Sequence, residues 1–158
     1  RVKTDAAIKA LAAKGGVIQI PFGNAFVDTA SAAKTQAYFV AYNDYQRQRT
    51  AGKTAQTVSE FDAEWDKAHP PLPVKMDALL DQIDYGVKLV GIDHIGIGSD
   101  FDGVSGALPE GLKTVADFPN LIAGLQARDY SDADIRKILG GNLLRMWRQV
   151  ETNATASR

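Results

Sequence analysis

The sequence predicts an α/β fold with parallel strands that forms one part of a larger sheet or barrel. Two short apolar segments are typical of strands, "VIQI" at 17–20 and "HIGIGSD" at 94–100, and helical patterns precede, separate and follow them. Strands that alternate with helices pair in parallel. Because two parallel strands alone leave both sheet edges open, we expect the 158 residues to be a portion of a longer polypeptide. The absence of an initiator methionine before Arg1 favours the same interpretation.

Composition and charge narrow the classes of function. The chain is 45% hydrophobic and 23% charged, which is typical of a globular domain. Its 18 Lys and Arg against 19 Asp and Glu give a formal net charge of -1, so nothing favours a nucleic-acid partner. The lack of cysteine excludes disulfides, a cysteine nucleophile and thiolate metal sites. No apolar run approaches the roughly 20 residues that span a bilayer, so we expect a soluble chain without a membrane span. The sequence does not decide its compartment, and both the bacterial periplasm and the cytoplasm stay open.

The first half of the chain predicts two helices beyond its first helix and strand. The pattern "DAAIKALAA" predicts a short helix over 5–13, which "KGG" ends, and the strand after it should end near Ile20 because Pro21 cannot donate a ladder hydrogen bond. The helix expected over 29–49 carries an aromatic stripe on one face. A short acidic helix over 59–69 presents two further aromatic side chains. The members of these two sets are Tyr38, Tyr42, Tyr45, Phe61 and Trp65.

The second half predicts one helix before the second strand and two after it. Apolar positions at helical spacing indicate a helix over 74–90, and the stretch 115–128 is expected to be helical after Pro119. A capping box, with Ser131 as N-cap and Asp134 three residues later, begins a last helix. Gly140 and Gly141 interrupt that helix, and we expect them to allow the close approach of a neighbouring segment. The end of the chain, 151–158, is polar and we expect it to fray.

Asp100 is the first candidate for a functional residue. Side chains alternate along a strand, so Gly96, Gly98 and Asp100 share one face, while Ile95 and Ile97 share the other and need helices to bury them. The two glycines should leave room beneath Asp100. The carboxyl ends of the strands are where α/β barrels build their active sites.

A second interpretation of "SDFDG" remains open on spacing alone. Asp100 or Asp102 can instead cap backbone amides in a turn before Gly103. His94 falls at the opposite end of the strand, roughly 20 Å away at ~3.3 Å per residue, so we expect a packed or hydrogen-bonded histidine there. His69 should be a solvated loop residue. No spacing of histidines and carboxylates predicts a metal site made wholly by this chain.

The second strand and the segments after it carry a resemblance. The stretch "VGIDHIGIGSDFDGV", together with "LPEGL", "FPNLIAGL" and "IRKILGGNLLRMW" further along the chain, closely resembles the C-terminal part of the renal or membrane dipeptidase family, peptidase family M19. The similarity covers nearly the whole chain, and "GIGSDFDG" is its most specific motif. It implies a metal-dependent hydrolase of the (β/α)8 TIM-barrel type, in which the two strands here are strands seven and eight.

The resemblance assigns roles to two residues. Asp100 matches the catalytic aspartate, which contacts the substrate and moves a proton from a metal-bridging water to the leaving amine. Arg1 matches the arginine that binds the substrate's terminal carboxylate, although "RVKTD" keeps only the arginine and Asp5 of the family's "R-N-V-P-D" segment. The family's zinc ligands precede the segment that Arg1 matches. We therefore expect two Zn²⁺ ions in the complete protein, with ligands on an N-terminal portion and none here.

These inferences combine into one hypothesis. Residues 1–150 are expected to be the C-terminal portion of one metallohydrolase barrel domain, with a helical excursion at about 24–73 that shapes substrate choice, and 151–158 a polar tail. With the N-terminal portion of the same enzyme, the chain should hydrolyse dipeptides as a zinc metallopeptidase, and alone it should be inactive. A homodimer stays open. The alternatives are a relative that acts on another substrate, and a noncatalytic α/β module in which "SDFDG" is only a capping turn.

Overall fold

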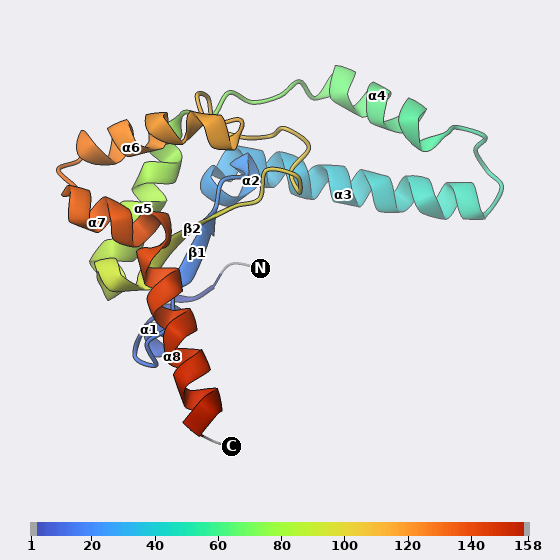
Figure 1. Cartoon of the computed structure of the whole chain (residues 1–158). Helices are drawn as coiled ribbons and strands as arrows, with labels where there is room; N and C mark the ends of the chain where they lie inside the picture. Colours follow the sequence, from blue (N-terminus) through green and yellow to red (C-terminus); the bar gives the residue numbers. More distant parts are fainter. Residues whose placement is uncertain (1–2, 157–158) are drawn as a thin grey trace.

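The computed structural model describes residues 3–156, so Arg1 lies outside the described residues. Helices dominate, and a small sheet lies among them (Figure 1). The helices are α1 (Asp5–Ala12), α2 (Asn24–Val27), α3 (Thr29–Thr50), α4 (Val58–Ala68), α5 (Met76–Val90), α6 (Phe118–Gln126), α7 (Asp132–Arg136) and α8 (Asn142–Ala156). Short helical turns are η1 (Ile92–His94), η2 (Val115–Asp117) and η3 (Lys137–Gly141). The strands are β1 (Ile18–Pro21) and β2 (Ile95–Ser99).

The two strands pair in parallel, which confirms the predicted α/β class. Ile18 lies opposite Ile95, and the register shifts by one residue after Ile20, where Pro21 comes opposite Ser99. The strand therefore includes Pro21, one residue beyond the expected end, because an irregularity in the ladder tolerates a residue without an N–H. Both strands end at the same edge, and the loops that carry the candidate site begin there.

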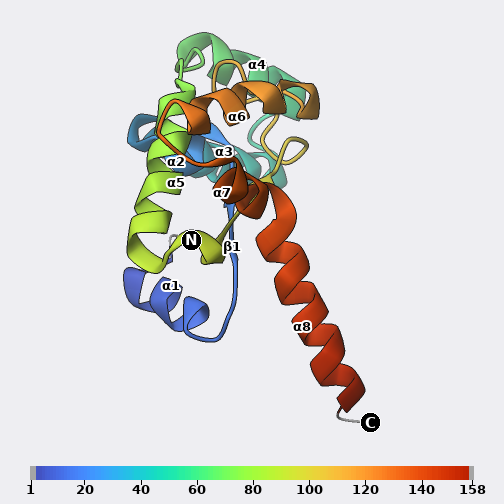
Figure 2. The same ribbon diagram turned by 60° about the vertical axis from the view of Figure 1, so that its left-hand side comes forward.

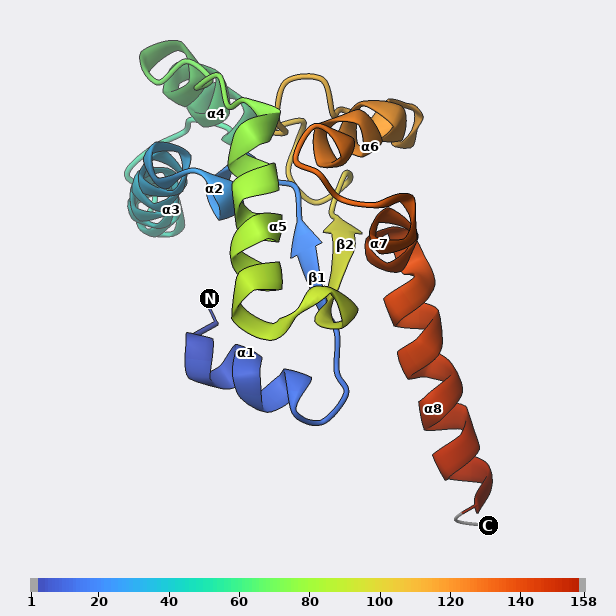
Figure 3. The same cartoon turned by 90° about the vertical axis from the view of Figure 1, so that its left-hand side faces the viewer.

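The core lies between the sheet and the helices beside it. Figure 3 shows α5 beside β1, α7 beside β2, and α1 near the strands' starting ends. Ile95 is 1% exposed and packs closely on α5, since a Cβ added to Gly86 would lie 2.7 Å from its Cδ1. The isoleucine face of β2 is thus buried by a helix, as its alternation predicts. The buried cluster consists of Phe22, Leu79, Leu80, Ile83, Ile95, Leu108, Leu112, Leu121, Leu125, Ile135 and Ile138.

Helices α3 and α4 form an arm that extends away from the sheet (Figure 1). The predicted aromatic stripe holds this arm together: the rings of Tyr45 and Phe61 stack with centroids 4.6 Å apart, and those of Tyr38 and Trp65 meet edge to face at 5.6 Å. Tyr38 Oη donates a hydrogen bond to Asp62 Oδ1 at 2.8 Å. The segment expected as a helical excursion thus contains α2, the α3–α4 arm and the linker that leads to α5.

The α3–α4 contact should weaken at alkaline pH. Burial and the Asp62 carboxylate raise the pKa of Tyr38 from its ordinary 10.0 to about 12. A tyrosine whose folded-state pKa is raised contributes stability that is complete below pH 10 and is lost as pH rises to about 12. We expect Tyr38→Phe to reduce the slope of unfolding free energy against pH across this window, measured by urea denaturation.

Asp62→Asn is the matched variant, because it removes the carboxylate and keeps the tyrosine. This variant should narrow the pH range over which stability is lost without abolishing it, since burial is the larger cause of the raised Tyr38 pKa. An identical slope in wild type and Tyr38→Phe would show that Tyr38 does not titrate within this range.

The last helix is interrupted at the two glycines. Gly140 has φ 156°, and the chain makes a π-helical turn over η3 before α8 begins. Nothing lies within 4 Å of a Cβ added to Gly140, so the predicted close approach of a neighbour is wrong there, and the glycine serves the wide turn instead. Helix α8 projects from the rest of the fold (Figure 2) and extends to Ala156, so residues 151–156 continue the helix instead of fraying. Within residues 3–156, no helix is long and apolar enough to cross a membrane.

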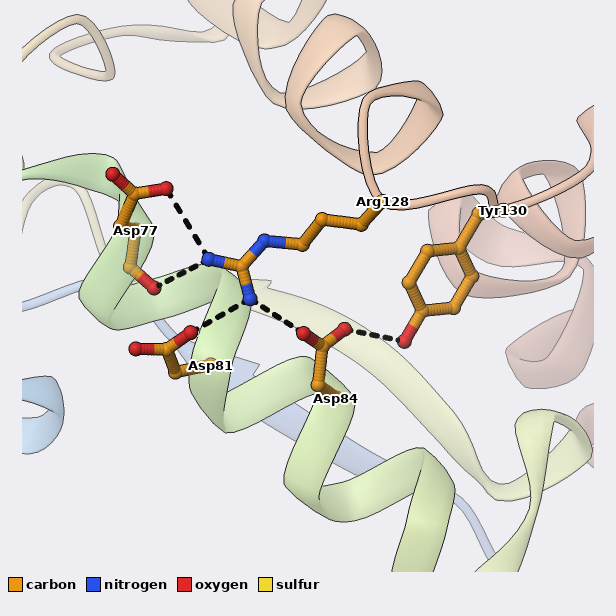
Figure 4. Close-up of polar contacts among 5 residues, drawn as sticks. All are labelled: Asp77, Asp81, Asp84, Arg128 and Tyr130. Carbon is orange, nitrogen blue, oxygen red and sulfur yellow. Dashed lines mark hydrogen bonds and ion pairs between the residues drawn. The ribbon is translucent and has the colours of Figure 1, made fainter.

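One arginine joins the end of α6 to the side of α5 (Figure 4). Arg128 Nη1 lies 2.7 Å from Asp81 Oδ1 and 2.5 Å from Asp84 Oδ2, and Nη2 lies 3.2 Å from Asp77 Oδ1. Tyr130 Oη donates to the other Asp84 oxygen at 2.8 Å. Burial and this carboxylate both raise the pKa of Tyr130. Three aspartates on one helix face repel one another, and the guanidinium group offsets that repulsion.

We expect Arg128→Met to lower the free energy of unfolding by roughly 1–3 kcal/mol, because it keeps the aliphatic stem and removes the donors. Urea denaturation would measure the loss, and high salt should shrink the difference because it screens the aspartates in the variant. Arg136→Met is the control, since Arg136 is exposed on α7 and forms no ion pair among the described residues. Equal midpoints for both variants would contradict a stabilising role for the Arg128 cluster.

Candidate functional site

Asp100 lies at the carboxyl end of β2, exposed, in a strained turn. Ser99 has φ 43° and Asp100 has φ 66°, so two consecutive residues with side chains occupy the left-handed region. Such backbone strain persists where the surroundings impose it, and it is frequent at functional sites. The turn stops the strand and presents the carboxylate at the edge where both strands end.

The Asp100 carboxylate does not cap the turn. The Gly103 amide donates to the backbone oxygen of Asp100 at 3.3 Å, not to its side chain. In the described part of the chain, neither the Asp100 nor the Asp102 carboxylate has a hydrogen-bond or ion-pair partner. Asp100 Oδ1 would lie 2.2 Å from a Cβ added to Gly103, so a side chain at residue 103 would displace the carboxylate. The carboxylate is left available for a ligand or substrate.

Contacts among three phenylalanine rings hold the loop that carries Asp100. Phe22 follows β1 directly, is fully buried, and its amide donates to Ser99 O at 2.9 Å. Its ring meets Phe101 edge to face at 5.6 Å and Phe118 at 6.1 Å. These contacts tie the loop after β2 to β1 and to α6, which fixes the backbone beside Asp100.

The face of the sheet below Asp100 is not empty. Gln19 lies opposite Gly96 in the parallel pair, and its side chain crosses both glycines. A Cβ added to Gly96 would lie 2.6 Å from Gln19 Oε1, and one added to Gly98 would lie 3.2 Å from Gln19 Cβ. The expectation of free space beneath Asp100 is therefore wrong, because the neighbouring strand fills it. Gln19 Nε2 is buried without a partner among residues 3–156.

Both histidines make contacts within the fold, away from Asp100. His94 is the last residue of η1, just before β2 begins, and its Nδ1 lies 2.8 Å from Gly16 O. This confirms the prediction of a hydrogen-bonded histidine at the end of the strand opposite Asp100. The His69 ring stacks on Trp65 with centroids 3.7 Å apart, at the exposed end of α4. No group of three or more histidine, aspartate or glutamate side chains within 3–156 is arranged to hold a metal ion. The described residues therefore do not fit a zinc centre.

A cavity of about 560 Å³ lies beside the Asp100 loop. Its walls come from the excursion, 24–38 and 65–74, and from the loop at 104–113. The backbone amide of Asn24 donates to Ala107 O at 2.8 Å and holds the two walls together. At the start of α3, the Ser31 amide donates to Asp28 Oδ2 at 2.6 Å and lowers the pKa of that carboxyl group. The excursion thus borders the loop that carries the candidate site.

Four residues that shape this region are not predicted by any pattern in the sequence: Phe22, Asn24, Gln19 and Asn142. Each is positioned by a contact between distant segments, which local periodicity does not reveal. Asn142 is 2% exposed, and its Nδ2 donates to Ile92 O at 2.7 Å and Ile95 O at 2.8 Å, so it holds the beginning of β2. The one available signal is a polar residue following two glycines within an apolar helix.

Comparison with known proteins places the chain. The family model described as "Membrane dipeptidase (Peptidase family M19)" matches residues 1–158. Dipeptidase ataJ of Aspergillus terreus is 48% identical over 73 residues, which are 46% of this chain and 18% of that protein. Human Dipeptidase 3 is 38% identical over 87 residues, which are 55% of this chain and 18% of that protein. The matched segments therefore make up less than a fifth of these two relatives.

Solved structures agree with this placement. The probable dipeptidase PvdM from Pseudomonas aeruginosa superposes with a TM-score of 0.65 at 34% identity, over 93% of this chain and 40% of that chain. A metallo peptidase from Rhodobacter sphaeroides, liganded with a phosphinate mimic of L-Ala-D-Ala, has a TM-score of 0.59 at 21% identity, which shows a shared fold. That match covers 90% of this chain and 30% of the other. With its family model matched from end to end, the chain belongs to the membrane dipeptidase family, peptidase family M19.

Proposed function

We propose that this chain supplies the C-terminal part of the active site of a dipeptide-hydrolysing enzyme, with Asp100 as its catalytic carboxylate. The observation that carries the proposal is the exposed Asp100 side chain at the carboxyl end of β2, which has no hydrogen-bond or ion-pair partner within residues 3–156, in a chain of a dipeptidase family. In α/β barrels, catalytic groups come from this end of the strands. The two strands here would be strands seven and eight of a (β/α)8 barrel.

Asp100 would act first as a base and then as an acid. It accepts a proton from the water that attacks the peptide carbonyl carbon, and a tetrahedral intermediate forms. When the C–N bond breaks, the same carboxyl group gives its proton to the departing amine nitrogen. One carboxylate can serve both steps, because the proton it gains is the proton that the leaving group needs. Its exposure and freedom from hydrogen bonds support this role.

Two further parts of the proposed site lie beyond the described residues. Arg1 would bind the substrate's terminal carboxylate, for which a guanidinium group is suited by its paired donors. Two Zn²⁺ ions would need ligands from a preceding portion of the same enzyme, since residues 3–156 do not fit a zinc centre. That portion would also cover the Gln19 face of the sheet. The missing capping bonds at Asp100 and Asp102 favour this proposal over a noncatalytic module.

The test is made on the protein that includes the preceding portion. Purified material is analysed for intact mass and metal content, and release of free amino acids is measured with a panel of dipeptides. The proposal expects about two zinc ions per complex, dipeptide turnover, loss of turnover with a chelator, and recovery when Zn²⁺ is added. A folded protein that hydrolyses no dipeptide with zinc present would overturn the assignment and favour another substrate.

A further inference from the structure

The cavity beside the Asp100 loop is built from two parts of the chain that leave the same edge of the sheet. Figure 1 shows α2 and the start of α3 close to the loop after β2, and the hydrogen bond from the backbone amide of Asn24 to Ala107 O joins them. Asn24 comes three residues after β1 ends, and Val104 comes four residues after Asp100. Asp100 itself does not line the cavity. The cavity is therefore a neighbour of the catalytic carboxylate and not the same site.

The charges on the cavity wall balance. Two basic and two acidic residues line the cavity, and none of them forms an ion pair within residues 3–156: Lys34, Lys113, Asp66 and Glu110. Both ammonium groups are held by the wall, since Lys34 Nζ donates to Pro70 O at 3.0 Å and Lys113 Nζ donates to Leu108 O. A lining with two charges of each sign favours a neutral polar ligand over an ion.

Two buried polar side chains of the wall are incompletely hydrogen-bonded within residues 3–156. Asn24 is 9% exposed and Ser31 is 7% exposed, yet within residues 3–156 Asn24 Oδ1 is buried without a hydrogen bond, and Ser31 Oγ has only the Asp28 carboxylate beside it. Nearly all buried polar groups in proteins are hydrogen-bonded, so an exception requires an explanation. Both residues line the cavity.

We propose that this cavity receives a substrate side chain that ends in a neutral amide, and that Asn24 and Ser31 bind that amide. A primary amide both donates and accepts, so its N–H can bond to Asn24 Oδ1 while its oxygen accepts from the Ser31 hydroxyl. The volume of about 560 Å³ exceeds that of any single amino-acid side chain, so size alone selects little. The selection comes from hydrogen bonding, with Tyr38 and Trp65 as the aromatic wall.

The inference rests on the proposed dipeptide hydrolysis and names its substrate class: dipeptides that contain glutamine. The test compares kcat/KM for L-Ala-L-Gln with L-Ala-L-Met, and for L-Gln-L-Ala with L-Met-L-Ala, because methionine has a similar length and no amide. Wild-type enzyme, Asn24→Leu and Ser31→Ala are compared. Asn43→Leu is the matched control, an exposed asparagine of α3 outside this cavity.

We expect the wild type and Asn43→Leu to prefer glutamine at one of the two positions by about tenfold, as the net gain of one hydrogen bond provides. Asn24→Leu should remove the preference by slowing only the glutamine substrate, and Ser31→Ala should reduce it. If Asn24→Leu does not fold, the small Ser31→Ala change still tests the site. Equal rates for glutamine and methionine in the wild type, or a preference that both variants retain, would overturn the inference. No hydrolysis of any of the four dipeptides would overturn the proposed function instead.

Discussion

Replacing Asp100 by asparagine in the complete enzyme is expected to lower kcat for dipeptide hydrolysis by roughly 100-fold to 10,000-fold, the range that general acid–base catalysis supplies. Asparagine keeps the size and the left-handed backbone tendency of aspartate, so the turn at Ser99 and Asp100 should form as before. It cannot take up the proton of the attacking water. The loss should therefore fall on the chemical step, and kcat and kcat/KM should decrease together.

Asp102→Asn is the control for this prediction, because Asp102 lies in the same exposed loop and its carboxylate also lacks a partner among the described residues. It should retain most of the activity. Urea denaturation of both variants should match the wild type, since neither carboxylate holds the loop together. If Asp100→Asn stayed active but unfolded more easily, Asp100 would have a structural role and the catalytic assignment would be wrong.

The sequence predicts the elements of this fold well because their signals are local. The strand predicted over 94–100 is observed over Ile95–Ser99. Of the predicted capping box, the N-cap is observed, since the Ser131 hydroxyl accepts from the Asp134 amide at 3.2 Å, but the reciprocal bond to the Ser131 amide does not form among the described residues. The aromatic stripe on 29–49 correctly indicates a packed face. Each of these patterns depends on neighbours along one segment, and period 2 or 3.6 is enough to identify it.

The surroundings of the candidate site could not be predicted in the same way. The position of Asp100 at a strand end is implied by the pattern, but Gln19 fills the glycine face only because the parallel register brings it opposite Gly96. The cavity likewise needs the contact between Asn24 and Ala107, which are far apart in the sequence. Such contacts depend on how two segments pair, and no single segment encodes them.

Asn142 shows most clearly how a distant contact fixes the strand that carries the candidate site. Its buried Nδ2 donates to Ile92 O and Ile95 O, at the point where η1 passes into β2. We expect Asn142→Ala to lower the free energy of unfolding by about 2–4 kcal/mol, because two hydrogen bonds are lost at a buried position and a small cavity is left. Urea denaturation followed by circular dichroism would measure the loss.

Asn120→Ala is the matched control, because Asn120 is exposed and donates one hydrogen bond, to Gly111 O, so its loss should stay below about 1 kcal/mol. Asn142→Asp sharpens the test. The introduced carboxyl group, when ionised, can only accept and would face two carbonyl oxygens, so its folded-state pKa must rise. The stability of this variant should therefore be highest at acidic pH and decrease as pH rises above the ordinary aspartate value of about 3.9. A pH profile parallel to that of the wild type would mean that the side chain at residue 142 does not hold the start of β2.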